Sequence, residues 1–307
     1  MTLLTPTSPP TALALQSLLG GMDSIVTWVG TDGVVHPISG GLAPRPPVAS
    51  GVQLIDIKGM HAPFKHVDQQ GAHQDGVTYL DTPYDAAEID MTIAIFGNNQ
   101  VERRRAYRRW LASWEPKKLG RMWWFTADMG HWWMDMRLMQ EPRDVIKAGD
   151  AASQEMAWSG RGDFPFWVSF DSMSTKLVAS DATTLADPAG KAAPNFMQLH
   201  NRGDQDGWPV ILLQGPGTFK TNDNGSDARQ ISLQLNAGEF ARIDTLPNRR
   251  TVLELNSGIN IYPRLKNRFS TAVAAGASVR MPITVTGATP GVTSAIASLT
   301  PWRRWPE

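Results

Sequence analysis

One stretch decides the fold class of this chain. Residues 89–96 read Ile89-Asp90-Met91-Thr92-Ile93-Ala94-Ile95-Phe96, with an apolar residue at every second position, and Gly97 ends the run. A period of two turns one face of a strand inward and leaves the other to water, as in antiparallel sheets. The same alternation at residues 52–57, and a hairpin pattern around Asp32-Gly33, predict further strands. The chain is therefore expected to be mainly β.

One amphipathic helix is expected in the N-terminal half, over about residues 98–115. Asn98 or Asn99 can cap it, and Pro116 stops it. Its apolar stripe, at i, i+3, i+4 and i+7, consists of Tyr107, Trp110, Leu111 and Trp114.

Two tryptophan-rich strands follow this helix, at residues 121–125 and 131–136. Alternate residues of a strand point to opposite faces, so one member of each Trp-Trp pair is expected in the core and its neighbour at solvent or at another subunit. Tryptophan is enriched at protein interfaces, and we name Trp124 and Trp133 as interface candidates. A platform on which sugar rings stack remains open as the alternative.

The composition changes between residues 171 and 194, where no aromatic residue occurs and Ala, Ser, Thr and Asp dominate. We predict an N-terminal extension at residues 1–45, a β domain carrying the helix at 46–175, and a linker at 176–195. Residues 196–307 contain short strands separated by Asn- and Gly-rich turns, which predicts a second, all-β domain. Both domains are expected to be antiparallel sandwiches or barrel-like.

The composition excludes several classes of protein. The 307 residues contain no Cys, which excludes disulfides and thiol chemistry. Lys plus Arg and Asp plus Glu both number 29, so the zero net charge gives no support to specific nucleic-acid binding. No run of about 18 apolar residues occurs, so no membrane insertion is expected.

No catalytic set, cofactor site or metal site is predicted. The sequence lacks a G-x-S-x-G elbow and an H-E-x-x-H pair. His61, His66 and His73 lie in a loop without carboxylates at ligand spacing, and we interpret them as solvated. The turn at 222–225 resembles the start of a calcium loop, but Ile231 stands where the closing Glu belongs. The Arg-Gly-Asp triplets at 161–163 and 202–204 are interpreted as turns between strands rather than adhesion motifs.

Charge is segregated along the chain despite the zero sum. Residues 71–97 carry five carboxylates and no Lys or Arg, while residues 98–121 carry eight Lys and Arg against two Glu. Three interpretations of the blocks remain open. The first is charge complementarity within one chain or a solvated helix face, and the second is complementary patches between copies. The third is a nucleic-acid groove, which the absence of any such module weakens. The interface candidates from these blocks are Asp81, Asp85, Arg104, Arg105 and Arg108.

A family resemblance joins these observations. The C-terminal half contains Asn201-Arg202-Gly203-Asp204, Trp208-Pro209-Val210-Ile211-Leu212 and Asn236-Ala237-Gly238-Glu239. The N-terminal half contains the loop residues Gly71, Asp75, Gly76 and Tyr79, followed by the Arg-rich helix and Trp-rich hairpin. With these motifs the chain resembles the siphophage distal tail proteins, often labelled phage minor tail proteins, whose C-terminal domain is a galectin-like β-sandwich.

The resemblance implies a non-catalytic structural role in the virion, at the distal end of the tail, after assembly in the host cytoplasm. Such proteins form a ring, usually of six copies, that joins the tail tube to the tail-tip hub, with the tape measure and receptor-binding proteins as further neighbours. A carbohydrate-binding module or glycan-active protein remains the alternative hypothesis, because galectin-like shape does not imply galectin function.

Overall fold

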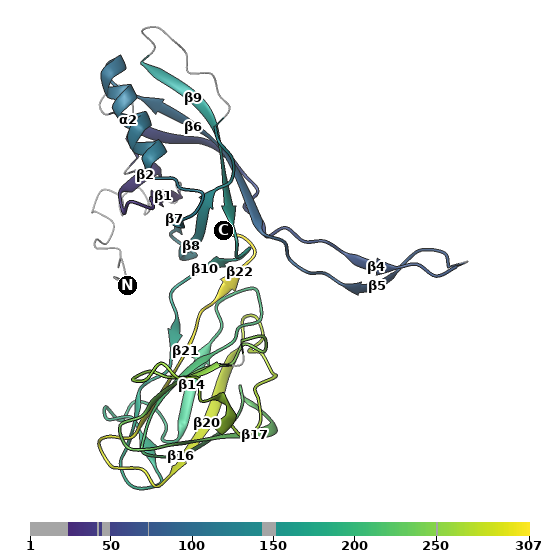
Figure 1. The fold of residues 1–307 in the computed structure, drawn as a ribbon, viewed down its shortest axis with the longest axis vertical. Helices are drawn as coiled ribbons and strands as arrows, with labels where there is room; N and C mark the ends of the chain where they lie inside the picture. The colour runs from purple at the N-terminus through teal and green to yellow at the C-terminus, as the bar shows by residue number, and fades with distance from the viewer. Residues whose placement is uncertain (1–23, 42, 45–49, 73, 143–151, 250) are drawn as a thin grey trace. The chain divides into compact units, whose positions relative to one another are not determined.

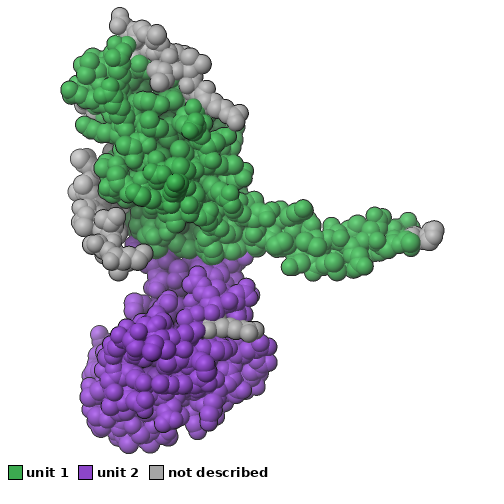
Figure 2. Space-filling model, in the orientation of Figure 1, with its two compact units in different colours: residues 1–168, 304–307 green, residues 169–303 purple. Residues whose placement is uncertain are grey.

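The computed structural model describes residues 24–41, 43–44, 50–72, 74–142, 152–249 and 251–307. The predicted fold class is confirmed: within this part the chain is mainly β, its sheets are antiparallel, and α2 (Gln100–Ala112) is the one α-helix. The chain divides into unit 1, residues 1–168 with 304–307, and unit 2, residues 169–303 (Figure 2). No helix in the described ranges is long and apolar enough to cross a membrane.

Unit 1 is built on one antiparallel sheet that curls until it is nearly a barrel. Its strands run in the order β2-β1-β7-β8-β9-β6-β3, with β10 beside β8, and β2 approaches β3 to bring the ends of the sheet together. The strands are β1 (Ile25–Val29), β2 (Val35–Ser39), β3 (Gly51–Lys58), β6 (Ala87–Phe96), β7 (Gly120–Thr126), β8 (Gly130–Leu138), β9 (Ser153–Gly162) and β10 (Trp167–Val168).

The alternation in residues 89–96 acts as predicted. β6 pairs with β9 from Ala87 opposite Gly162 to Phe96 opposite Ser153 without a break in register. The side chains at every second position are buried, while Glu88 and Asp90 on the opposite face are exposed. This strand therefore carries one wall of the unit 1 core.

Helix α2 begins where its capping residues require. The side chain of Asn99 accepts a hydrogen bond from the Glu102 backbone N–H (3.0 Å), and the Glu102 carboxylate accepts one from the Asn98 N–H (3.2 Å). The helix spans residues 100–112, slightly less than expected, and its buried stripe differs from the predicted one. Leu111 is exposed, and the buried positions within the helix are Arg103, Ala106 and Trp110.

The unit 1 core is dominated by tryptophan and methionine. Trp28 stacks on Trp114 with ring centroids 3.7 Å apart, and Trp110 meets Trp158 edge-on at 5.8 Å. The Trp28 indole N–H donates to the Ser113 hydroxyl (3.0 Å), which satisfies its one polar atom inside the core. Rings from β1 and β9 of the sheet thus pack against rings of α2 and of the segment that follows it.

A hairpin projects from the rest of unit 1 (Figure 1). It consists of β4 (Val67–Gln69) and β5 (Thr78–Asp81), which pair antiparallel, and we call residues 60–86 the arm. Gly76 near its tip has φ +80°, a left-handed conformation suited to glycine. All residues of both arm strands are exposed.

Unit 2 is a sandwich of two antiparallel sheets. One has the order β13-β12-β21-β15-β18-β19 with β11 beside β21, and the other has the order β14-β20-β16-β17. The elements of the sandwich are β11 (Ser172–Met173), β12 (Leu177–Ala179), β13 (Leu185–Ala186), β14 (Phe196–His200), β15 (Val210–Gln214), β16 (Gly217–Asp223), β17 (Ser226–Leu235), β18 (Phe240–Asp244), β19 (Thr251–Glu254), the 3-10 turn η1 (Tyr262–Arg264), β20 (Ser278–Thr286) and β21 (Ser294–Leu299). The last strand of residues 169–303, β22 (Trp302–Arg303), belongs to neither of these two sheets.

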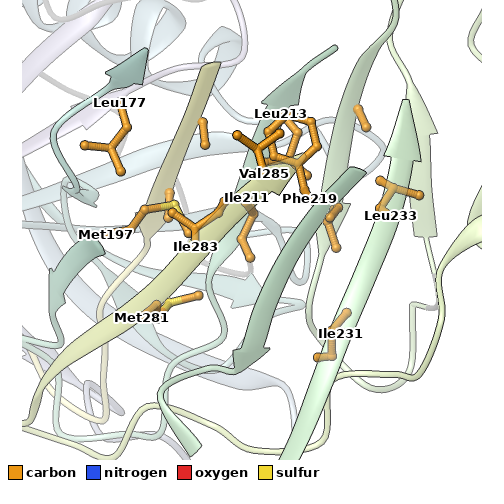
Figure 3. Packing of buried hydrophobic residues seen from close by; sticks show 14 of the residues in the cluster. Leu177, Met197, Ile211, Leu213, Phe219, Ile231, Leu233, Met281, Ile283 and Val285 are labelled. Carbon is orange, nitrogen blue, oxygen red and sulfur yellow. The ribbon is translucent and has the colours of Figure 1, made fainter. Parts of the chain in front are cut away.

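Side chains from both sheets of unit 2 form one aliphatic core. Figure 3 shows Ile211 and Leu213 of β15 among Phe219 of β16 and Ile283 and Val285 of β20. The strands range from two residues in β11 to ten in β17.

The boundaries of the units differ from those expected. Unit 2 begins at Ser169, and the expected linker at 176–195 contains β12 and β13, whose Leu177 and Leu185 are fully buried. Small polar residues surround these two short strands, so the composition resembles a linker although alternate apolar residues enter the core. Within the expected N-terminal extension at 1–45, β1 and β2 are strands of the unit 1 sheet. Residues 1–23 lie outside the described ranges.

Candidate assembly surfaces

The register of β7 and β8 decides which tryptophans reach the surface. Trp123 pairs with Trp133, and Trp124 pairs with Trp132. Trp124 and Trp132 are buried in the unit 1 core, whereas Trp123 and Trp133 are half-buried on the opposite face. Trp124 therefore does not lie on a surface. Its ring meets that of Trp167 inside the core, at 6.3 Å between centroids.

The outward face of β7 and β8 carries an ordered row of cross-strand pairs. The Arg121 guanidinium donates to both carboxylate oxygens of Asp135, at 2.6 and 2.9 Å, and lies 5.1 Å from the Trp133 ring centroid. Trp123 contacts Trp133 at 4.7 Å between centroids. These half-buried side chains contact one another across the two strands, and cross-strand pairs of this kind stabilise a sheet.

Two histidines of unit 1 are held toward their neutral forms. Burial lowers the pKa of His131, which packs on Phe125 at 4.2 Å between ring centroids. Burial is also the largest cause that lowers the pKa of His36; Asp32 opposes this shift and Arg109 adds to it.

The basic candidates lie on one exposed side of helix α2. Arg104, Arg105 and Arg108 are exposed, as is Arg109, and we call these four residues the basic face. Arg103 points the other way, is 5% exposed, and donates to the Gln154 side-chain oxygen (2.8 Å). The helix thus uses one arginine within unit 1 and presents four to its surroundings.

The acidic candidates Asp81 and Asp85 lie on the arm. Both are exposed, as are Asp68 and Asp75, and Lys65 is the one Lys or Arg in residues 60–86. The Asp81 carboxylate accepts a hydrogen bond from the Thr82 backbone N–H (2.8 Å). The arm is therefore a thin acidic projection.

The arm also exposes large apolar side chains. Phe64, Val67, Val77, Tyr79 and Leu80 are between 41% and 60% exposed. Tyr79 and Leu80 are neighbours on β5, so they point to opposite faces of the ribbon. Both faces of the arm are thus suited to contact with another surface.

The two charge blocks do not neutralise each other within one chain. In the part of the chain that the structure describes, no ion pair joins the arm carboxylates to the basic face. Asp90 of the acidic block accepts a hydrogen bond from the Ser159 hydroxyl (2.5 Å), a partner within unit 1 and not on the basic face. This observation argues against the reading of the blocks as partners inside one chain.

The remaining sequence motifs have structural contacts. Asp163 of the first Arg-Gly-Asp triplet pairs with Arg137 (2.5 Å), and Gly203 of the second donates its N–H to the Asn201 side chain (3.0 Å). A Cβ at Gly203 would collide with the Trp302 backbone oxygen. Both triplets thus occupy positions that the fold itself requires.

The histidine loop does not form a ligand cluster in the described residues. The His66 ring bonds the Thr82 hydroxyl (2.8 Å), the His61 ring packs beside Trp305 at 5.3 Å, and His73 lies outside the described residues. No group of three or more His, Asp and Glu side chains in these ranges is arranged to hold a metal ion.

Asp223 of unit 2 has several hydrogen-bond partners. The Asp223 carboxylate accepts hydrogen bonds from the backbone N–H and hydroxyl groups of Ser270 and Thr271, at 2.7 to 3.1 Å. Although burial alone would raise it, these bonds together lower the pKa of Asp223. The turn at 222–225 is thereby attached to a distant loop, and its carboxylate has a structural role.

The arm is not apparent from the sequence as a separate projection. The sequence indicates a loop at Gly71, Asp75, Gly76 and Tyr79. Only the structure shows that the strands beside this loop pair with each other and leave the sheet. The available signal was a short apolar run, Val77 to Leu80, after an Asp-Gly turn.

No protein-family model and no curated protein matches this sequence. Solved structures do resemble it. The Dit protein of phage SPP1, described as a paradigm of the hub adsorption apparatus in phages that infect Gram-positive bacteria, matches with a TM-score of 0.58 and 11% identity, over 91% of this chain and 98% of that one. A chain of the phage P2 baseplate in its activated conformation matches with a TM-score of 0.51 and 12% identity, over 92% of this chain and 99% of that one. At this identity the likeness establishes the fold.

Proposed function

We propose that this chain is a non-catalytic structural protein of a long-tailed phage, and that copies of it form a ring at the distal end of the tail. The observation that carries the proposal is the likeness to a Dit protein and a baseplate chain along nine-tenths of the sequence, which includes both units. The ring would have six copies and would join the tail tube to the tip hub. Unit 2 would be the galectin-like outer domain, with receptor-binding proteins and the tape measure as further neighbours.

The contacts between copies follow from the charges of unit 1. The arm carries Asp81 and Asp85, the basic face carries Arg104, Arg105 and Arg108, and these groups have no ion pairs with one another in the described chain. We infer that the arm of one copy lies against the basic face of the next. A head-to-tail contact of this kind closes into a ring when the rotation between copies permits it, and opposite charges select the correct register.

The mass of the purified full chain in solution tests the ring. Light scattering is expected to give a multiple of 33.7 kDa, with six copies as the expected number. The double substitution Arg104→Glu and Arg105→Glu should shift the protein toward the monomer, most strongly in low salt, because exposed charges are screened as ionic strength rises. Lys117→Glu with Lys118→Glu, an equal charge change at exposed positions beyond the helix, is the matched control.

The charge-swapped partner decides between a specific contact and a general effect of charge. Asp81→Lys with Asp85→Lys should restore the oligomer when combined with the two Arg→Glu changes. An oligomer that the Arg→Glu variant leaves unchanged in low salt would reject the role of the basic face. A wild-type protein that stays monomeric when mixed with a tail-tube ring would reject the ring.

Glycan binding is the second candidate function, and one observation favours it. Trp123 and Trp133 form a half-buried aromatic pair beside Arg121 on the outward face of unit 1, a surface on which a sugar ring can stack. Quenching of tryptophan fluorescence by cell-wall glycans, lost in Trp133→Ala and kept in Trp208→Phe of unit 2, would support this function.

A further inference from the structure

The arm joins the rest of unit 1 through residues 60–64 and 82–86, which we call the root of the arm. The chain leaves β3 after Lys58 and turns at Gly59, whose φ is +79°. A Cβ at this position would collide with the Glu88 carbonyl oxygen, so only glycine allows the arm to leave the sheet here. The turn at Gly59 therefore fixes the point at which the chain leaves the sheet.

The two strands of the arm are joined to each other at the root. The Asp85 N–H donates to the Pro63 carbonyl (2.9 Å), and the Lys65 N–H donates to the Pro83 carbonyl (3.1 Å). Phe64 and Tyr84 form an isolated bridge between these bonds. The arm consequently moves as one ribbon, and whatever holds the root determines where the ribbon points.

The segment that leaves unit 1 holds one side of the root. Trp167 is fully buried, and its indole N–H donates to the Met60 carbonyl (2.9 Å). Phe166 meets Tyr84 edge-on at 4.8 Å between ring centroids. The chain passes from this segment into unit 2 at Ser169.

The segment that returns to unit 1 also contacts the root. Residues 304–307 belong to unit 1, although residues 169–303 form unit 2. The Arg304 carbonyl accepts a hydrogen bond from the N–H of Ala62 (2.8 Å), a residue that is 4% exposed. The Trp305 ring lies 5.3 Å from that of His61.

We infer that residues 166–167 and 304–305 form a clasp that sets the direction of the arm. Both places where the chain crosses between the units end on the arm root, so the residues that attach unit 2 are the residues that position the arm. If either crossing segment moved, it would have to carry the arm root with it or break these contacts. Packed contacts of this kind transmit a displacement instead of bending freely. The inference concerns the single chain and does not depend on the ring.

Hydrogen exchange of the full chain tests the clasp. A variant that ends at Arg303 lacks both Arg304 and Trp305, and amide exchange at residues 60–64 and 82–86 should rise roughly tenfold, as expected when one buried hydrogen bond and a ring contact are lost. A variant that lacks only the exposed Glu307 is the matched control and should exchange like the wild type. Exchange in β17 of unit 2 should stay unchanged in both.

A pair of side-chain variants keeps the test decisive if the shortened chain does not fold. Trp305→Ala should raise exchange at residues 60–64, and Trp305→Phe, which keeps a ring beside His61, should restore most of the protection. Unchanged exchange at the root in the chain that ends at Arg303, or equal exchange in the alanine and phenylalanine variants, would overturn the clasp. These exchange rates are compared in the Arg104→Glu with Arg105→Glu background, where the contact proposed at Asp85 is weakened, so failure here is distinguishable from failure of the ring.

Discussion

The two units solve the problem of burial in different ways. The core of unit 1 is rich in tryptophan and methionine, and its surface carries the acidic arm with its exposed apolar side chains and the basic face of α2. Unit 2 has an aliphatic core and ties its buried Asn, Asp and Glu groups to nearby backbone. The two units therefore differ in the residue types that fill their cores and in the charge that their surfaces expose.

The largest effect is expected in the tryptophan core. Trp110→Ala should lower the unfolding free energy of unit 1 by about 3–5 kcal/mol, because Trp110 is fully buried between Trp114 and Trp158 and its removal leaves a cavity. Chemical denaturation followed by tryptophan fluorescence reports mainly on unit 1, which contains ten of the twelve tryptophans. Leu111→Ala, one residue along the helix but exposed, should change stability by about 0.5 kcal/mol. Similar losses in the two variants would contradict the burial difference.

The buried polar network of unit 2 is expected to give the next largest effect. The Asn201 side chain donates to the Gln205 and Val273 carbonyls (2.8 and 3.0 Å) and accepts from the Gly203 N–H. Asn201→Ala should destabilise unit 2 by about 1–3 kcal/mol, because these groups lose their partner away from water. Calorimetry should show a lower transition temperature for unit 2, with Gln198→Ala, an exposed position on β14, as the control. A shift of the unit 1 transition instead would break the comparison.

The stability of unit 2 is expected to depend on pH through the Glu254 carboxylate. Hydrogen bonds from Ser257, and then from the Asn256 backbone N–H, hold the pKa of Glu254 at about 2. This pKa lies below the unfolded value of about 4.3, so the stabilisation is present above the unfolded value and is lost as pH falls toward 2. Glu254→Gln should lower the Tm of unit 2 at pH 7, and the difference from wild type should shrink between about pH 5 and pH 2. A difference that is constant across this range would exclude titration of Glu254 as its source.

The smallest effect on stability is expected in the arm. Tyr79→Ser with Leu80→Ser should leave the unfolding free energy within about 0.5 kcal/mol, because both side chains are exposed. The same variant should lose the oligomer in light scattering if the arm is a contact between copies. Val34→Ser with Val35→Ser, also exposed in unit 1, is the control and should keep the oligomer. An arm variant that still assembles would show that the apolar arm serves another purpose.

Much of the fold could be predicted because it depends on neighbouring residues. The alternation at 89–96, the Asn99 cap and the strand-rich second half all reflect local backbone preferences. The candidate site was predicted less completely. Asp81, Asp85 and the three arginines lie on exposed surfaces, but Trp124 lies in the core, because strand alternation does not say which face of a strand is inward.

The sequence by itself determined the periodicity of the strands, the position of the helix and the segregation of charge. Each of these features depends on residues that are only a few positions apart in the chain. Only the tertiary structure decided that Trp123 rather than Trp124 faces outward, that residues 177–186 join the unit 2 sheet, and that residues 304–307 return to the arm root. These features depend on pairing between segments far apart in the chain. Their energies come from register and packing, which no local pattern encodes.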